Sequence, residues 1–150
     1  MELNVISSAS PYYSQVLEPR NRILRLPLGL NLSDEDLRDE ENQFTVVMTR
    51  DEKVLACIML KIIDKDTIKL RQMAVDDSVQ GAGVGAMVLS YAENFCILNN
   101  YFSIELHARK SAIGFYLKSG YSIEGTEFEE VGIPHVKMNK NLRRANEINE

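Results

Sequence analysis

The segment Gln80-Gly-Ala-Gly-Val-Gly85 places three glycines within five residues, between two stretches of different periodicity. Residues 67–75 before it alternate and then become continuously apolar, as a strand does when it enters a covered core. After it, apolar residues recur at spacings of three and four, which predicts an amphipathic helix. The predicted buried stripe of this helix is Val84, Met87, Val88, Tyr91, Ala92 and Phe95.

A glycine loop that opens a helix is a favourable place for an anion. The first backbone N–H groups of a helix have no intrahelical partner and lie at the positive end of its dipole. Glycines lack Cβ atoms and adopt positive φ, so that the amides can converge on phosphate oxygens. The alternative is a turn that only packs the helix tightly against a sheet. The order of strand, loop and helix favours anion binding.

Charge and length limit the classes of partner. The 150 residues are enough for one domain, and we predict a single domain over residues 1–150. Seventeen Lys and Arg against 22 Asp and Glu give a formal net charge of −5. This balance excludes a broadly basic nucleic-acid protein, and we predict no nucleic acid as partner. A site built from backbone dipoles still allows an acidic protein to bind a polyphosphate.

The two cysteines and the apolar runs indicate a cytoplasmic protein. No apolar run approaches the roughly 18 residues of a membrane span, and the start of the chain does not resemble a signal peptide, so we expect no membrane partner. Cys57 and Cys96 form no C-x-x-C motif and lie in apolar surroundings, which is typical of reduced core thiols. With His107 and His135 they lack metal-ligand spacing, so we expect no metal.

The chain as a whole alternates strands and helices irregularly. We expect a mixed α/β sheet rather than a uniform succession of βαβ units. Pro19 should kink or divide the first helix, and Ser33 should cap a second short helix. The expected strands are 3–7, 44–49, 54–60, 67–75, 102–107, 121–128 and 136–142, and the expected helices begin at Ser10-Pro11, Ser33, the glycine loop and Ser111, the last one being stopped by Gly120.

The glycine loop has a first alternative interpretation, as a dinucleotide-binding turn. Gly81-x-Gly83-x-x-Ala86, with Glu105 about 20 residues further on, has the form of a Rossmann fingerprint. That fold places its glycine turn after its first strand, whereas at least three predicted strands precede the turn here. We therefore keep a Rossmann-like nucleotide-binding module only as a lesser hypothesis.

Two motifs together resemble the GNAT superfamily of N-acetyltransferases. Gln80-x-x-Gly83-x-Gly85 is similar to its acetyl-CoA motif, and the segment from Ala112 through Phe115-Tyr116 to Gly120-Tyr121 is similar to its A-x-x-F-Y-x-x-x-G-F/Y pattern. The resemblance implies a mixed, mostly antiparallel sheet of six to seven strands flanked by about four helices. The segments 24–29 and 132–135 further resemble the ElaA/YjcF-like bacterial branch.

The resemblance implies an acetyl-CoA-dependent N-acetyltransferase that acts on a primary amine, by direct attack in a ternary complex. The glycine-loop amides would bind the pyrophosphate, and the end of the preceding strand would pair with the pantetheine arm. Arg109 stands where many members have Asn, and a cation there can approach the phosphates. The predicted cofactor-binding residues are Met73, Ala74, Val75, Gln80, Gly81, Ala82, Gly83, Val84, Gly85, Ala86, Arg109, Ala112 and Phe115.

The catalytic assignments follow from proton chemistry. Tyr116 is the candidate general acid for the leaving thiolate, the alternative being a tyrosine that only packs on the sheet. The base remains open among two imidazoles and three glutamates, with His135 placed first and His107 second. The glutamates in question are Glu105, Glu129 and Glu130.

Binding of the acceptor amine is less determined by the sequence. Arg25 would bind an acidic group of the acceptor, unless it is simply an exposed helix arginine, and Glu129 is a second candidate for contact with the acceptor. We expect a monomer or homodimer. The alternative to an enzyme is a non-catalytic module that binds or senses acyl-CoA.

Overall fold

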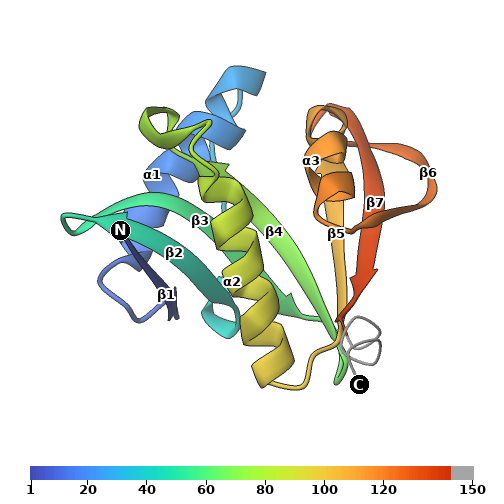
Figure 1. Ribbon diagram of the computed structural model, residues 1–150. Coiled ribbons are helices and arrows are strands. Elements are labelled where there is room, and N and C mark those ends of the chain that lie inside the picture. Colours follow the sequence, from blue (N-terminus) through green and yellow to red (C-terminus); the bar gives the residue numbers. More distant parts are fainter. Residues whose placement is uncertain (143–150) are drawn as a thin grey trace. The chain divides into compact units, whose positions relative to one another are not determined.

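The computed structural model describes residues 1–142 and shows a seven-stranded sheet in the order β1-β2-β3-β4-β5-β7-β6 (Figure 1). The elements are β1 (Glu2–Ile6), α1 (Tyr13–Leu24), β2 (Phe44–Arg50), β3 (Lys53–Ile62), β4 (Thr67–Val75), α2 (Val84–Leu98), β5 (Ser103–Arg109), α3 (Ile113–Lys118), β6 (Ser122–Glu130) and β7 (Ile133–Asn141). Short 3-10 turns occupy Leu26–Leu28, Glu40–Asn42, Asp77–Val79 and Lys110–Ala112. The mixed, mostly antiparallel sheet confirms the predicted fold class, with three α-helices in the described part of the chain.

The chain forms two compact units, which we describe separately. The first contains residues 1–61 and 71–92, and the second contains residues 62–70 and 93–142. In the first unit β1, β2 and β3 pair in antiparallel fashion. Residues 54–60 of β3 are buried without interruption, as expected of a strand covered on both faces. Val16 of α1 packs there with Val47, Cys57 and Ala74 from three strands.

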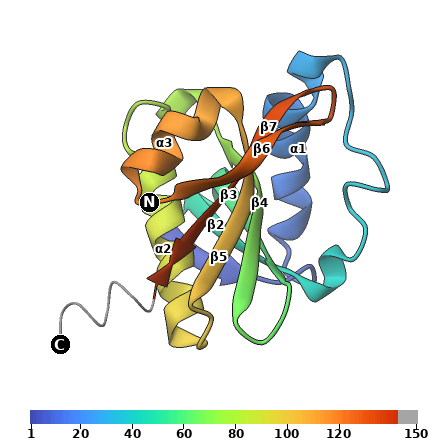
Figure 2. The same cartoon turned by 90° about the vertical axis from the view of Figure 1, so that its right-hand side faces the viewer.

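The second unit is built around β5. The first four residues of β4 pair with β5 in parallel, from Thr67 opposite Ser103 to Leu70 opposite Leu106. On the other side of β5 the β6–β7 hairpin continues the sheet in antiparallel fashion (Figure 2). Burial along β5 alternates with period two, so that Ile104, Leu106 and Ala108 face the core and the residues between them share the opposite face.

The first helix differs from the prediction. It begins at Tyr13 instead of Pro11, although the Ser10 hydroxyl still accepts a hydrogen bond from the Tyr12 N–H at 3.2 Å. Pro19 lies inside the helix and does not divide it. Ile23 and Leu24, beyond the proline, pack against the core cluster of the first unit, and this burial offsets the backbone hydrogen bond that a proline cannot make.

The predicted short helix at Ser33 is wrong, because residues 34–39 form turns. The capping chemistry is nevertheless present. The Ser33 N–H donates to the Asp36 carboxylate at 3.0 Å, and the Asp36 N–H donates to the Ser33 hydroxyl at 3.2 Å. This reciprocal pair satisfies the turn locally without a helix following it.

The buried face of α2 is only partly the predicted one. Met87 is 42% exposed, whereas Leu89 and Cys96, which lay outside the predicted stripe, are buried. The buried positions are Val84, Val88, Leu89, Ala92 and Cys96. Because apolar residues surround most of this helix, its periodicity alone does not determine which face packs.

Candidate active site

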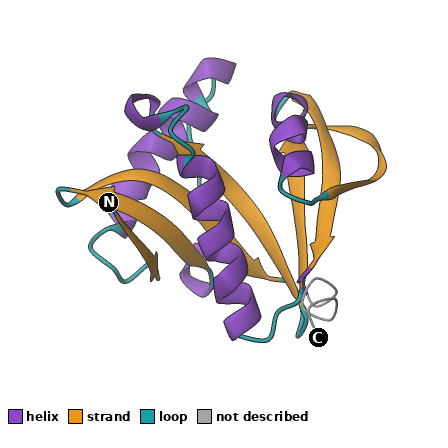
Figure 3. Ribbon diagram, viewed as in Figure 1, coloured by secondary structure: helices purple, strands orange, loops and turns teal. Residues whose placement is uncertain are grey.

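The glycine loop is held at its start by a network at the end of β4. The Asp76 N–H donates to the Leu55 carbonyl at 2.8 Å, and the Asp76 carboxylate accepts from the Ser78 N–H and hydroxyl. Gln80 reaches back over this turn, where its Nε2 donates to the Val75 carbonyl at 3.1 Å. Figure 3 shows the succession of strand, turn, loop and helix. The loop therefore leaves the strand in a fixed direction.

The Asp76 carboxylate is kept ionised by its surroundings. The hydrogen bonds from Ser78, from its N–H and then its hydroxyl, lower the pKa of Asp76 to about 2, and Arg22 adds to the effect through a 2.8 Å ion pair. Arg22 belongs to α1, so this pair joins the first helix to the start of the loop. Both residues lie in the first unit.

The loop itself is open above its backbone. Gly81 and Gly83 have φ of 81° and 77°, and a Cβ atom at either position would meet no atom within 4 Å. The first hydrogen bond of α2 runs from the Met87 N–H to the Gly83 carbonyl at 3.1 Å. The N–H groups of Val84, Gly85 and Ala86 precede that bond and have no intrahelical acceptor. The loop thus offers an open cradle with aligned donors, which fits a pyrophosphate group.

The strand edge before the loop contains a local distortion. Gln72 has φ of 56°, the left-handed conformation that is uncommon for residues other than glycine. It immediately precedes Met73, Ala74 and Val75, the segment predicted to pair with the pantetheine arm. Ala74 is buried, and Met73 and Val75 are half-buried.

A buried ion cluster that the sequence did not reveal supports this strand. Glu40 is 2% exposed and accepts hydrogen bonds from Arg20, Tyr13 and Arg71 at 2.6–2.9 Å. Burial raises the pKa of Glu40, but the hydrogen bonds from Arg20 and Tyr13 outweigh it and hold that pKa below its ordinary value. Arg20 also donates to the Gln72 side chain at 3.4 Å. The cluster therefore connects α1, the Glu40 turn and β4.

Arg25, the candidate for binding an acidic acceptor, is not an exposed helix arginine. It is 6% exposed, and its guanidinium donates twice to the Asp36 carboxylate, at 2.9 and 3.2 Å. A third hydrogen bond goes to the Leu24 carbonyl at 3.1 Å. Its role toward an acceptor stays a prediction, and any acceptor carboxylate would compete with Asp36.

The candidate acid Tyr116 lies in the second unit, on α3. It is 8% exposed, and its ring makes edge-to-face contacts with Phe115 and Tyr121 at 5.0 and 5.6 Å. Burial raises the pKa of Tyr116 to about 12, so that the hydroxyl keeps its proton at neutral pH. The helix ends as predicted near Gly120, which has φ of 93°, and the Tyr121 N–H donates to the Tyr116 carbonyl at 3.0 Å.

The other predicted residues of the second unit lie at the end of β5 and the start of α3. Arg109 is the last residue of β5 and stands opposite His135 of β7. Ala112 ends the 3-10 turn that joins β5 to α3, and Phe115 is half-buried in that helix. Their contacts with a cofactor remain predictions.

Both candidate imidazoles converge on one carboxylate. His107 Nδ1 lies 2.9 Å from Glu130 Oε1, and His135 Nε2 lies 3.7 Å from Glu130 Oε2. Phe128 contacts both rings, edge to face with His107 at 4.9 Å and stacked with His135 at 6.1 Å. Glu129, which lies between Phe128 and Glu130 on β6, is exposed. Sequence spacing could not reveal this group, because it assembles from three strands.

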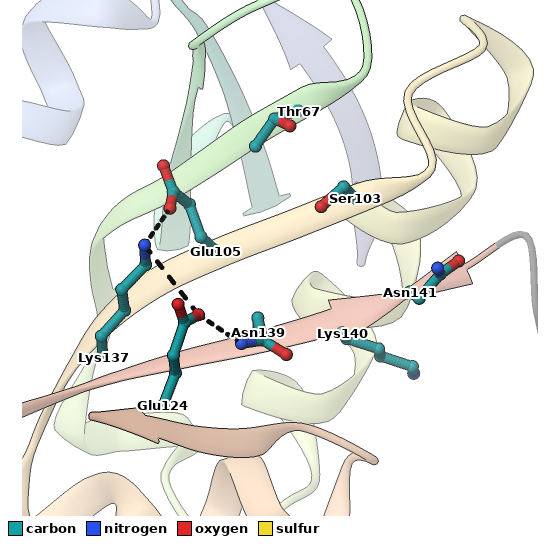
Figure 4. A pocket seen from close by; sticks show the side chains of 8 residues that line it. All are labelled: Thr67, Ser103, Glu105, Glu124, Lys137, Asn139, Lys140 and Asn141. Carbon is teal, nitrogen blue, oxygen red and sulfur yellow. Dashed lines mark hydrogen bonds and ion pairs between the residues drawn. The ribbon is translucent and has the colours of Figure 1, made fainter.

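A second polar group lines a pocket of about 340 Å³ on the same face of the second unit (Figure 4). Lys137 points between two carboxylates, 3.0 Å from Glu105 and 3.9 Å from Glu124. Glu105, and more weakly Glu124, raise the pKa of Lys137 above its usual value. The lining consists of Thr67, Ser103, Glu105, Glu124, Lys137, Asn139, Lys140 and Asn141. Because Lys137 already occupies the space between the carboxylates, the pocket has no single dominant charge.

The two cysteines are buried and not activated. Burial raises the pKa of Cys57 to about 11 and that of Cys96 to about 12, as predicted for core thiols rather than nucleophiles. Among residues 1–142 no group of His, Cys, Asp or Glu is suited to hold a metal ion. No helix in this part of the chain is long and apolar enough to cross a membrane.

Two proteins of Bacillus subtilis (strain 168) are similar in sequence. The uncharacterized protein YyaT is 37% identical over 78 residues, which cover 52% of this chain and 53% of YyaT. The uncharacterized N-acetyltransferase YjcF is 34% identical over 73 residues, which cover 48% and 52%. The chain thus matches about half the length of these curated relatives.

Solved structures show the same fold over nearly the whole chain. Escherichia coli ElaA superposes with a TM-score of 0.82 at 17% identity and covers 94% of this chain and all of its own. A GNAT family acetyltransferase from Elizabethkingia anophelis, solved with acetyl-CoA bound, superposes with a TM-score of 0.72 at 16% identity and covers 94% and 97%. A model of the acetyltransferase (GNAT) domain matches residues 31–142, and the chain belongs to this family.

Proposed function

We propose that the chain, as one domain over residues 1–150, is an N-acetyltransferase that transfers the acetyl group of acetyl-CoA to a primary amine. The observation that supports this most directly is the open glycine cradle, with N–H groups at the start of α2 that have no intrahelical acceptor. Its shape and donors suit the pyrophosphate of coenzyme A, and the family resemblance of both motifs supports the choice of this anion.

The residues of the chain can be given distinct tasks in this reaction. Amides between Gly81 and Ala86 bind the pyrophosphate, apart from that of Ala82, which donates to the Val79 carbonyl at 3.3 Å. The backbone of residues 73–75 pairs with the pantetheine amides. An N–H near Val75 donates to the thioester oxygen as negative charge develops on it. Acetyl-CoA supplies the activated acyl group. The amine attacks it directly, without an acyl-enzyme intermediate.

Tyr116 donates a hydrogen bond to the sulfur as the C–S bond breaks. The pKa of Tyr116 in the protein without ligand is about 12, which exceeds that of a typical thiol, about 8.5. Full transfer of the tyrosine proton to the sulfur is therefore uphill. The hydroxyl therefore acts chiefly as a donor that stabilises the departing thiolate. This role depends on the hydroxyl oxygen of Tyr116, whereas a packing role would depend only on its ring.

Replacement Tyr116→Phe should lower kcat about tenfold to a hundredfold and leave KM for acetyl-CoA nearly unchanged, because only the hydroxyl is lost. Steady-state thiol release with an active amine measures both constants. Tyr121→Phe is the matched control: it removes a neighbouring buried hydroxyl that donates to Glu93 at 2.8 Å. Equal loss of kcat in both variants would assign Tyr116 to packing instead of chemistry.

Ligand binding and turnover test the function as a whole. Acetyl-CoA at 100 times its Kd should add about 2.7 kcal/mol of stability in a thermal-shift experiment, and coenzyme A should act similarly. A preference for NAD would support the Rossmann-like alternative. Acetyl-CoA turnover is then measured against a panel of small-molecule amines, aminosugars and peptides. Tight binding without turnover across that panel would indicate a sensing module.

A further inference from the structure

The hydrogen bond between His107 and Glu130 fixes the position of the imidazole proton. An ionised carboxylate only accepts hydrogen bonds, so that in the 2.9 Å contact the hydrogen belongs to His107 Nδ1 and is donated to Glu130 Oε1. In the neutral ring the other nitrogen, Nε2, then carries a lone pair. This is the tautomer that a general base requires at Nε2.

The ring is also held in orientation. Phe128 stands edge to face with His107 at an interplanar angle of 74°, and it lies opposite His135 in the β6–β7 pairing. The imidazole of His107 is therefore fixed both by a hydrogen bond at one nitrogen and by a ring contact. A side chain that neighbouring groups hold in the productive geometry can act as a base without a prior change of conformation.

His135 differs from His107 in access. Its side chain is 4% exposed, and its Nδ1 donates to the Ile133 carbonyl at 2.9 Å. The side chain of His107 is 28% exposed, and within residues 1–142 its Nε2 has no hydrogen-bond partner. Of the two imidazoles, only His107 therefore presents a basic nitrogen to solvent.

We infer that His107 is the general base of the acetyl transfer and that Glu130 is its positioning residue. This inference rests on the proposed function. The amine nitrogen forms a bond to the thioester carbon, and the C–S electron pair leaves with the sulfur. The proton that the attacking nitrogen must lose passes to His107 Nε2, while Glu130 stabilises the resulting imidazolium and stays ionised. His107 later returns the proton to water.

The charges around His107 come from its own strand, from the β6–β7 hairpin and from β4, where Lys69 stands opposite Glu105. Glu105 and Arg109 lie two residues away on the same face of β5, and Lys137 stands directly opposite on β7. Lys137 is engaged by Glu105, which leaves the Glu130 carboxylate as the partner in direct contact with the ring. His135 lies next to this carboxylate at 3.7 Å.

The tautomer can be measured without turnover. In ¹⁵N-labelled protein at a pH where the ring is neutral, the two ring-nitrogen shifts of His107 should show hydrogen on Nδ1 and none on Nε2. Glu130→Ala should remove this preference and shift the ring toward the Nε2–H form that is usual in water. A wild-type ring with hydrogen on Nε2 would overturn the inference, whatever the activity.

Kinetics test the role in catalysis. His107→Gln should lower kcat/KM for the amine by about a hundredfold or more, leave the affinity for acetyl-CoA unchanged and abolish the loss of activity at low pH. Glu130→Gln should retain more activity than His107→Gln, because the ring keeps a hydrogen-bond partner but the imidazolium loses its counter-charge. Glu127→Gln is the matched control, since Glu127 lies on the same strand and pairs with Lys110 at the surface.

The outcomes separate this inference from the proposed function. A wild type that turns over no amine would overturn the proposed function and the base together. A wild type that is active, with His107→Gln equally active and showing the same pH profile, would overturn only the base. A profile of Glu130→Gln identical to that of Glu127→Gln would remove the positioning role. Circular dichroism of each variant checks that the fold is intact.

Discussion

At the scale of single residues, the carboxylate of Glu40 joins parts of the chain that are far apart in the sequence. It binds three side chains that lie 20, 27 and 31 positions away in the sequence. No local pattern links these positions, and in the sequence Glu40 belongs to an ordinary acidic run. This explains why the cluster was not predicted, whereas Tyr116 and the glycines stand within short, contiguous motifs.

Glu40→Ala should lower the free energy of unfolding by about 3–5 kcal/mol, because it leaves the fully buried guanidinium of Arg20 without its counter-charge. Urea unfolding at neutral pH measures this loss. The adjacent, exposed Glu41→Ala should change stability by less than about 0.5 kcal/mol.

The stability difference between wild type and Glu40→Ala should depend on pH. Because the pKa of Glu40 is lowered on folding, its stabilising contribution is complete above the unfolded pKa of about 4.3. It is lost as pH falls through the lower, folded pKa. The difference between wild type and Glu40→Ala should therefore shrink below pH 4, and a constant difference would contradict the ionised pairing.

At the scale of elements, strands were easier to predict than helices. The run 67–75 was predicted with the bounds that β4 shows, and β2, β3 and β5 differ from prediction by one or two residues at their ends. Alternation and β-branched residues mark such strands locally. The extent of α1 past Pro19 and the face that α2 buries depend on what packs against them, and this information is not local.

The glycine loop can be tested as an element. Gly83→Ala introduces a Cβ at φ of 77°, a conformation that costs an L-residue roughly 1–2 kcal/mol and that should turn the converging amides away. We expect acetyl-CoA affinity to fall about tenfold or more by calorimetry. Gly29→Ala is the control, since Gly29 has φ of 74° and equally open space outside the loop. It should lose similar stability and keep its affinity.

At the scale of the whole molecule, the net charge of −5 should affect the rate at which charged amines reach the proposed site. An acidic protein attracts cations over a distance that salt shortens, to about 10 Å at 0.1 M ionic strength. The anion cradle instead uses backbone dipoles, which act at short range. The composition thus argued against nucleic acid as a partner but contained no information on the cofactor site.

For a cationic acceptor, kcat/KM should therefore fall as ionic strength rises from 0.05 to 0.5 M, by roughly two- to tenfold. The cause is the loss of long-range attraction, so that kcat at saturation should change little. An acceptor of zero net charge serves as the comparison. If both acceptors respond alike, salt acts on the protein generally and not on encounter with the amine.

The burial of both thiols has a practical consequence for measuring this activity. In the proposed reaction each turnover releases one molecule of free coenzyme A, and thiol-specific reagents are the direct way to count it. Cys57 and Cys96 are shielded and poorly ionised, so that they react slowly with such reagents. In the folded protein these two thiols therefore contribute almost no background to such a count.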